Sequence, residues 1–473
     1  MTAIWERRSR KRRRGAVEEP FDRRLLTPMV LGSLLNPVNS TLIAVALVSI
    51  GLTYDASPAE TAWLVTGLYL ATAVGQPVVG RLVDLYGPRR LFIFGTVLVG
   101  GAGLLGAVAP SLEVLLIARV LIGIGTCAGY PAAMYLVRSE ARRTGRDSPQ
   151  AVLMLLSVST QMVAAIGPTV GGVLLGLGSW RYIFAINVPL AILALVFGFI
   201  RLPKGNPLGK TTPIGRLASL DLAGMMLFGS SLTILMLFLM APLLSSLYLL
   251  AVAALLILAF TLRELRASNP FLDVRILAGN LPLILTYLRQ LFVYVGSYGF
   301  MYGFVQWLEH TRGLSPVSAG LMMAPLFGVG IIGSAVTGMR PGIVSKLVIG
   351  SASMMAGCVF MLFAQQNSAL WILLVIAGAV GLAQALVSLA NQNALYRQAE
   401  ESRTASSAGL LRTFTYLGAM FSAVAISLCF PESGADTIGL HKLALLMLGC
   451  SAALLLISVA DRSLLIKRKN PSK

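Results

Sequence analysis

The acidic side chains beside apolar stretches are the first groups in this sequence that could do chemistry, because a carboxylate can gain and lose a proton or pair with a cation. Asp84 stands in GRLVDLYGPRR, residues 80–90, between two long stretches that avoid charge almost entirely. The other acids also lie toward the ends of apolar stretches: Glu113, Asp221, Glu264, Glu309 and Asp461. A proton-binding centre deep in apolar surroundings therefore has no obvious carboxylate.

Two arginines, Arg119 and Arg289, fall inside apolar stretches. A charged side chain at membrane depth costs about 2.5–3.5 kcal/mol on insertion scales, so each must face water, a partner or a ligand. We expect both to face a central cavity, where positive charge without an acid would favour neutral or anionic ligands over hydrophobic cations. For Arg289 an equally weighted alternative is a place near a helix end, bonded to helix carbonyls.

Other reactive side chains are sparse. Glu309 and His310 form an adjacent pair that could titrate near physiological pH, although a wetted helix end is the favoured interpretation. The other histidine and the four cysteines have no metal-ligand spacing. The sequence has no nucleotide-binding loop and no hydrolase nucleophile motif. We expect no catalytic residue, metal or cofactor, and a protein that is not an enzyme.

The elements that position these residues are membrane helices. The chain is 56% apolar and 12% charged, with a mean hydropathy of +0.80, against about 45–50% apolar residues in soluble domains. Apolar runs of about 20 residues are long enough to cross a bilayer. The sequence predicts an all-α polytopic protein with fourteen spans, at residues 25–50, 58–80, 89–109, 112–138, 151–177, 182–201, 218–240, 243–262, 280–308, 315–337, 343–364, 369–395, 404–429 and 439–460.

The basic residues predict the orientation of these spans. Alternating the sides places nearly all of the 38 Lys and Arg on the side of both termini. The exceptions are Arg119 and Arg289 within spans and Arg181, Arg312 and Lys442 on the opposite side. Basic loops mark the cytoplasmic side, so both termini should be cytoplasmic, in a bacterial inner membrane. The run RRSRKRRR, residues 7–14, is better explained as a topogenic signal than as a nucleic-acid arm.

The predicted spans group as six, two and six. Residues 25–201 form the first bundle, residues 202–279 an inserted hairpin with its connectors, and residues 280–461 the second bundle. Basic cytoplasmic segments, 1–24 and 462–473, flank them. The loop GMRPGIVSK at residues 338–346 is a degraded copy of the stretch at residues 80–90 in the matching position of the second bundle, which suggests two related halves with substrate bound between them.

The stretch at residues 80–90 resembles the second-to-third-helix signature of the major facilitator superfamily. The resemblance implies a major facilitator fold, in which the glycines permit a tight cytoplasmic turn. It also implies that the aspartate and basic residues bind neighbouring helix ends and hold the cytoplasmic side shut. Leu85 and Pro88 depart from the usual pattern. The matching residues are Gly80, Leu82, Asp84, Gly87, Arg89 and Arg90.

Two further stretches resemble the fourteen-helix drug:proton antiporter family within that superfamily. IARVLIGIGTCAGYPAA, residues 117–133, is similar to the fourth-helix pattern with its membrane arginine, here Arg119. IGPTVGGVLLGLGSWRYIFAINVP, residues 166–189, is similar to the fifth-helix motif of exporters and the stretch after it. Proline and glycine there predict a pliable, tightly packed helix. The motif residues are Gly167, Pro168, Gly171 and Gly172.

The resemblance implies a proton-coupled exporter of small amphipathic compounds, such as drugs or natural products, that works as a monomer in the lipid bilayer. Relatives often carry an aspartate where this chain has Asn39. The alternative is therefore a facilitated or differently coupled carrier of a neutral or anionic metabolite or lipid-like solute. The expected partners are a small-molecule substrate and protons, and no nucleic acid.

Overall fold

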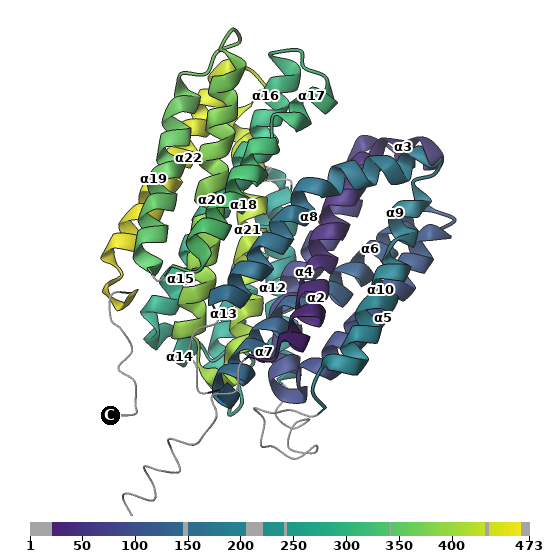
Figure 1. Ribbon diagram of the computed structural model, residues 1–473, viewed down its shortest axis with the longest axis vertical. Coiled ribbons are helices and arrows are strands. Elements are labelled where there is room, and N and C mark those ends of the chain that lie inside the picture. Colours follow the sequence, from purple (N-terminus) through teal and green to yellow (C-terminus); the bar gives the residue numbers. More distant parts are fainter. Residues whose placement is uncertain are drawn as a thin grey trace, which may run out of the picture.

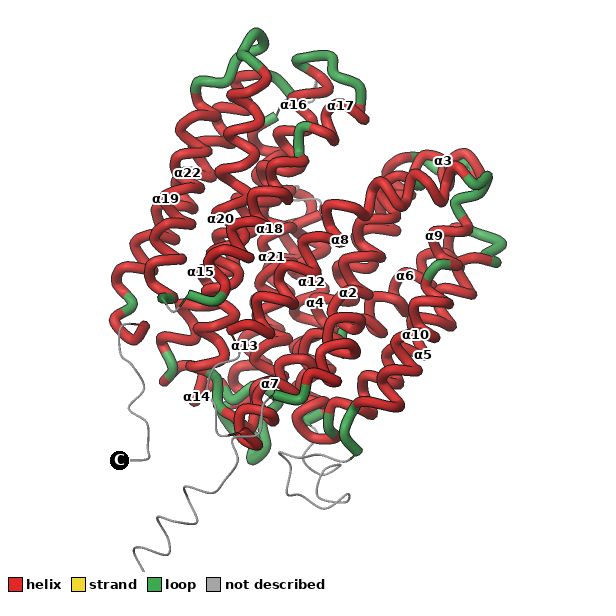
Figure 2. The backbone as a smooth tube through the Cα atoms, in the orientation of Figure 1, coloured by secondary structure: helices red, strands yellow, loops and turns green. Residues whose placement is uncertain are grey.

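The computed structural model describes residues 21–144, 150–204, 221–240, 244–340, 342–430 and 435–464. These residues form helices and connecting turns, with no strand among them (Figure 2). Thirteen helices in the described part are long and apolar enough to cross a membrane. Helices suit lipid because each satisfies its own backbone hydrogen bonds. The all-helical membrane fold is thus confirmed. The predicted segments 1–24 and 462–473 lie almost wholly outside the described residues.

The ninth predicted span, residues 280–308, is helical but is not among the thirteen. It is built from α15 (Leu281–Tyr298), a π-helical stretch (Gly299–Phe304) and α16 (Val305–His310). Single π-helical turns inside α-helices are frequent at functional sites. The count of fourteen stays a prediction.

The first half of the chain forms one bundle (Figure 1). The local sequence explains where α4 begins. Ser57 accepts a hydrogen bond from Glu60 N–H, and the Glu60 side chain accepts one in return from Ser57 N–H, a pair known as a capping box. The helices are α2 (Leu26–Leu42), α3 (Leu47–Tyr54), α4 (Pro58–Tyr86), α5 (Pro88–Ala107), α6 (Leu112–Thr126), α7 (Gly129–Thr144), α8 (Gln150–Gly176), α9 (Arg181–Ala185) and α10 (Asn187–Arg201).

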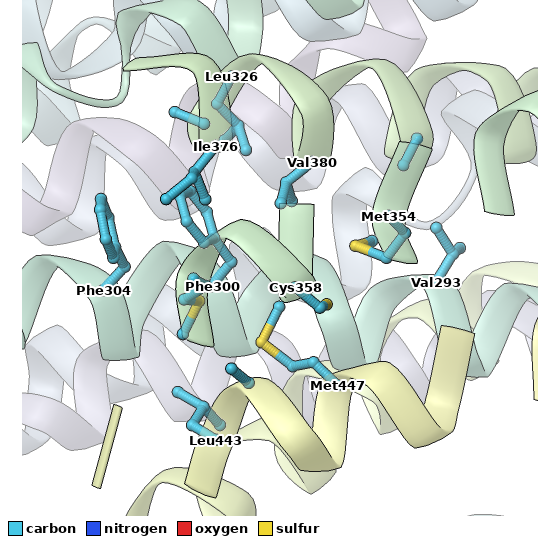
Figure 3. Close-up of a cluster of buried hydrophobic side chains, with 14 of the residues drawn as sticks. Val293, Phe300, Phe304, Leu326, Met354, Cys358, Ile376, Val380, Leu443 and Met447 are labelled. Atoms are coloured by element: carbon cyan, nitrogen blue, oxygen red, sulfur yellow. The ribbon is translucent and has the colours of Figure 1, made fainter. Parts of the chain in front are cut away.

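The second half forms a matching bundle around an apolar core (Figure 3). In that core Phe300 and Phe304 stack with their ring centroids 4.6 Å apart, and Met354, Cys358 and Met447 are buried with them. Besides α15 and α16 its helices are α17 (Pro316–Leu321), α18 (Ala324–Gly338), α19 (Ile343–Leu362), α20 (Leu370–Gln398), α21 (Thr404–Cys429) and α22 (Thr437–Ala460).

Between the halves in the sequence lie α12 (Leu222–Met240), α13 (Leu247–Glu264) and the short α14 (Val274–Gly279). Apolar side chains of α12, among them Leu232 and Met236, pack with Ala73 of α4 and Met420 of α21. The hairpin therefore covers a seam between the two halves. The domain boundaries predicted from the sequence remain a prediction.

Asp221 holds the base of this hairpin together. It accepts hydrogen bonds from Gly224 N–H at 2.8 Å and Phe271 N–H at 3.3 Å, and it pairs with Arg263 at 2.8 Å. Desolvation raises the pKa of Asp221. The hydrogen bond from Gly224, a side-chain hydrogen bond with Glu264, the charge of Arg263 and the hydrogen bond from Phe271 together outweigh it and hold that pKa below its usual value.

Candidate functional site

The two halves meet at one end of the bundle, where α2 begins and α22 ends, which we name the terminal end (Figure 1). Here Asp84, near the end of α4, faces the first turn of α21. Its carboxylate accepts hydrogen bonds from Ala405 N–H at 3.0 Å, Ser406 N–H at 2.9 Å and the Ser406 hydroxyl at 2.7 Å. A carboxylate at a helix N-terminus is favoured by unpaired N–H groups and by the helix dipole. Asp84 thus joins the halves.

Glycines let α4 and α21 approach backbone to backbone beside Asp84. A Cβ on Gly80 would lie 2.5 Å from the Ala405 carbonyl oxygen, and one on Gly409 would lie 2.3 Å from that of Gln76. Gly87 has a φ of 89°, a conformation that other residues rarely adopt. Gly409 lacks a recognisable motif, which is why sequence reasoning missed it.

The basic residues of the same motif have different surroundings. Arg89 donates hydrogen bonds to the carbonyl oxygens of Phe199 and Leu202, each at 2.9 Å, at the end of α10. A cation at a helix C-terminus is stabilised by the unpaired carbonyls and the dipole. Arg90 is exposed. Asp84 therefore binds across the two halves, whereas Arg89 ties two helices within the first half.

Arginines of α7 add to the contact at the terminal end. Arg138 is buried, donates to the Tyr396 carbonyl oxygen at 3.2 Å, and lies 3.5 Å from Glu401. Arg142 donates to Glu401 through two of its nitrogens. Glu401 belongs to the second half, so these arginines add contacts between the two halves at the terminal end. Sequence reasoning had assigned them only a topogenic role.

Arg119 is 2% exposed and lies between helices of the first half. It donates to the carbonyl oxygens of Leu64 at 2.8 Å and Asn39 at 3.0 Å, and its second terminal nitrogen has no hydrogen-bond partner. Asn39 itself donates to Leu35 and to the Asn187 side chain at 2.6 Å. Neither residue is among those that line the cavity described below, because backbone carbonyls and Asn187 take their hydrogen bonds. Their role in translocation stays a prediction.

The prediction that Arg289 is an uncompensated charge facing the cavity is wrong. Arg289 forms an ion pair with Asp461 at 2.9 Å, and both side chains are buried. It also bonds to Thr286 at 2.6 Å and to Asn391 at 3.3 Å. Asp461 follows α22 at the terminal end, so the helix-end alternative describes Arg289 better, although its main partner is a carboxylate rather than a carbonyl.

A cavity of about 30 Å³, partly open to solvent, lies between the halves. Its one charged lining side chain is Arg412 of α21, whose guanidinium lies 4.2 Å from the ring centroid of Tyr130. Sequence reasoning had counted Arg412 with the flank of a basic loop and missed it. The lining residues are Gly32, Ser33, Asn36, Pro37, Gln76, Thr126, Tyr130, Arg412 and Tyr416.

Hydrogen bonds along the cavity wall connect the halves. The Tyr416 hydroxyl donates to Asn36 Oδ1 at 2.8 Å, and Asn36 Nδ2 donates to Thr126 Oγ1 at 3.0 Å. Three other polar groups of the cavity wall have no hydrogen-bond partner. The Ser33 hydroxyl, Gln76 Oε1 and the Tyr130 hydroxyl are buried without a hydrogen-bond partner, a state that costs free energy unless water or a ligand satisfies it.

The four residues of the predicted fifth-helix motif differ in their packing on α2. A Cβ on Gly167 would lie 2.0 Å from Thr41 Oγ1, and one on Gly171 would lie 2.7 Å from Val45 Cγ2. Gly172 has nothing within 4 Å of such a Cβ. Pro168 lies inside α8. The first and third positions of the motif therefore set the α2–α8 contact.

The remaining candidates lie outside these contacts. Glu309 is half-buried and His310 exposed at the end of α16. All four cysteines are free. In the described ranges, no group of three His, Cys, Asp or Glu side chains could hold a metal ion.

Comparison with known proteins identifies relatives that are membrane transporters or export proteins. Residues 29–423 match the Major Facilitator Superfamily. The chain is 31% identical over 449 residues to the uncharacterized MFS-type transporter YwoD of Bacillus subtilis, covering 93% of this chain and 97% of that protein. It is 30% identical over 347 residues to the tetracenomycin C resistance and export protein of Streptomyces glaucescens, covering 69% of this chain and 60% of that protein.

Among solved structures, the human organic anion transporter MFSD10 aligns with a TM-score of 0.67 and 17% sequence identity. The alignment covers 93% of this chain and 100% of that one. At this identity the likeness concerns the fold alone.

Proposed function

This chain belongs to the major facilitator superfamily, and on that premise we propose that it exports small amphipathic compounds by alternating access, drawing on the proton gradient. It is a transporter rather than an enzyme. In alternating access the two halves close one end of a central cavity while the other end opens. The substrate site is the cavity between the halves.

The observation that carries this proposal is the closure at the terminal end. Asp84 accepts three hydrogen bonds from the start of α21, and Arg138 and Arg142 reach Glu401 in the other half. Interactions of this kind can break and re-form without unfolding a helix, as a reversible gate requires. Export as the direction of transport is supported by a relative whose name describes resistance and export.

The membrane arrangement belongs to the same proposal. The terminal end faces the cytoplasm of a bacterium, both termini are cytoplasmic, and α15 with its continuation makes the fourteenth span. The distribution of basic residues supports this orientation. The working unit is a monomer, since each chain contains both halves around one cavity.

One observation favours a second function, transport that is not coupled to protons in this way. No carboxylate is among the residues that line the cavity, and Asn39 stands where related exporters often carry an acid. A facilitated or differently coupled carrier of a neutral or anionic solute needs no such acid.

Transport in reconstituted vesicles separates the two functions. Purified protein is placed in liposomes that contain a pH-sensitive dye, and tetracenomycin C is a suitable first compound because a relative is named for exporting it. The proposal expects substrate movement that is driven by an imposed pH gradient and accompanied by proton movement in the opposite direction. Substrate movement that does not depend on the imposed pH gradient would instead establish the second function.

A further inference from the structure

The cavity between the halves contains a positive charge with no counter-ion. Arg412 lies about two turns after the start of α21, and its side chain is half-buried. No described carboxylate pairs with it, and its contact is the ring of Tyr130 at 4.2 Å. Two buried acids of the terminal end already have partners, Asp84 on α21 and Asp461 on Arg289. The charge is therefore free to meet a ligand.

Hydrogen-bonding groups converge on the same space from other helices. The hydroxyls of Ser33 on α2 and Tyr130 on α7 are 6% and 4% exposed, and neither has a partner. Both can donate a hydrogen bond, as the guanidinium can. Donors from three helices that surround one small space fit a group with several acceptor oxygens. Gln76 Oε1, also unpartnered, can accept a hydrogen bond from a substituent beside that group.

Aromatic rings provide a wall for the rest of the ligand. Tyr416 lines the cavity, and its ring centroid lies 5.6 Å from that of Tyr69. Tyr130, whose ring lies against the Arg412 guanidinium, also lines the cavity. Aromatic side chains favour offset or edge contacts with another ring at such distances.

We propose that Arg412, Ser33 and Tyr130 form a subsite for the anionic group, a carboxylate or phenolate, of an aromatic substrate. This assignment rests on the proposed function, in which the cavity is the transport site. A guanidinium binds a carboxylate through two parallel hydrogen bonds. A lipophilic cation at the same place would be repelled, because no acid in the described ranges offsets the charge of Arg412.

The test compares two probes that differ in charge but hardly in shape, 2-naphthoate and 2-naphthamide. Their binding to the purified full-length protein is measured by isothermal titration calorimetry in detergent. Charged hydrogen bonds are worth about 1.5–3 kcal/mol, so naphthoate should bind at least about tenfold more tightly than naphthamide. Arg412→Gln should remove this ratio, and Arg412→Lys should retain part of it.

Arg181→Gln is the matched control. The Arg181 guanidinium also lies over an aromatic ring, 4.4 Å from the centroid of Trp180, but outside the cavity. This variant should keep the wild-type ratio. Ser33→Ala provides a second test that leaves folding intact, since the Ser33 hydroxyl has no partner to lose. It should weaken naphthoate at least about tenfold, because the hydroxyl loses a hydrogen bond to a charged group.

Equal binding of the two probes to the wild type would overturn the subsite, as would no binding of either probe. An unchanged ratio in Arg412→Gln would do the same. Vesicle transport that does not respond to the pH gradient, combined with an intact preference for naphthoate, would refute the proton-coupled exporter and leave the subsite standing.

Discussion

Asp84 and Ser406 are 322 positions apart in the chain, and yet the carboxylate of Asp84 accepts hydrogen bonds from both the N–H and the hydroxyl of Ser406, at 2.9 and 2.7 Å. In the proposed transport cycle these bonds form when the terminal end closes and break when it opens. The energy of the contact therefore contributes directly to the balance between the closed and open states of that end.

Replacing Asp84 by Asn should open the terminal end. The variant loses charge-assisted hydrogen bonds, worth about 1.5–3 kcal/mol, which changes the population ratio roughly tenfold or more. Spin labels at the exposed positions Arg90 and Arg397 would report longer distances by pulsed electron resonance, and transport would fall.

Asp273→Asn is the control for this experiment. Asp273 caps α14 by accepting a hydrogen bond from Ile276 N–H, without bridging the halves. Its distance distribution should match that of the wild type. If Asp84→Asn also leaves distances and transport unchanged, Asp84 is not a gate residue.

Gly167→Ala should destabilise the protein while Gly172→Ala should not. The new Cβ at Gly167 would overlap Thr41 Oγ1, whereas the one at Gly172 meets nothing within 4 Å. Overpacking typically costs about 1–3 kcal/mol. Thermal unfolding in the same detergent compares the two variants, and equal melting temperatures would show that the α2–α8 contact does not depend on a glycine at position 167.

Arg289→Gln should reduce stability rather than change substrate preference. The substitution leaves Asp461 as a buried charge without its guanidinium partner, a loss of about 3–5 kcal/mol. The double variant Arg289→Met, Asp461→Leu removes both charges and should recover most of the melting temperature. A single variant that melts like the wild type but transports different compounds would show that Arg289 serves the cavity after all.

The contribution of Asp221 to stability should depend on pH. Its folded pKa is below the unfolded value of about 3.9. Its stabilisation is therefore complete above the unfolded value and is lost as the pH falls through the folded one. Asp221→Asn should be less stable than the wild type by about 1 kcal/mol at pH 7, as for other helix caps. This difference should shrink in melting curves recorded below about pH 3.9, and a constant difference would contradict the assignment.

Cysteine labelling tests the orientation. In a background without the four native cysteines, Asn367→Cys and Arg90→Cys place single thiols at exposed positions on opposite ends of the bundle. A membrane-impermeant maleimide added to intact cells should label position 367 and not position 90. The reverse pattern would invert the proposed topology.

The sequence by itself determined the membrane helices and identified the motif at residues 80–90, whose role as a gate is a proposal. Long apolar runs can satisfy their backbone only as helices in lipid, and the described helices follow the predicted spans closely. The motif could be identified from the sequence because each of its residues meets a local requirement. Gly80 allows a close helix crossing, Asp84 places a charge near the end of α4, and Gly87 adopts a positive φ.

Only the tertiary structure decided which buried charges have partners. Arg289 and Asp461 are 172 positions apart, and Arg412 has no acid at hydrogen-bonding distance among the residues that the structure describes. Neither fact follows from hydropathy, because hydropathy gives the depth of a residue but not the direction in which its side chain points. That direction depends on the rotation of each helix about its axis, which is set by packing against helices distant in the sequence. The charge of the cavity was therefore assigned to Arg119 and Arg289 from the sequence and belongs to Arg412 in the structure.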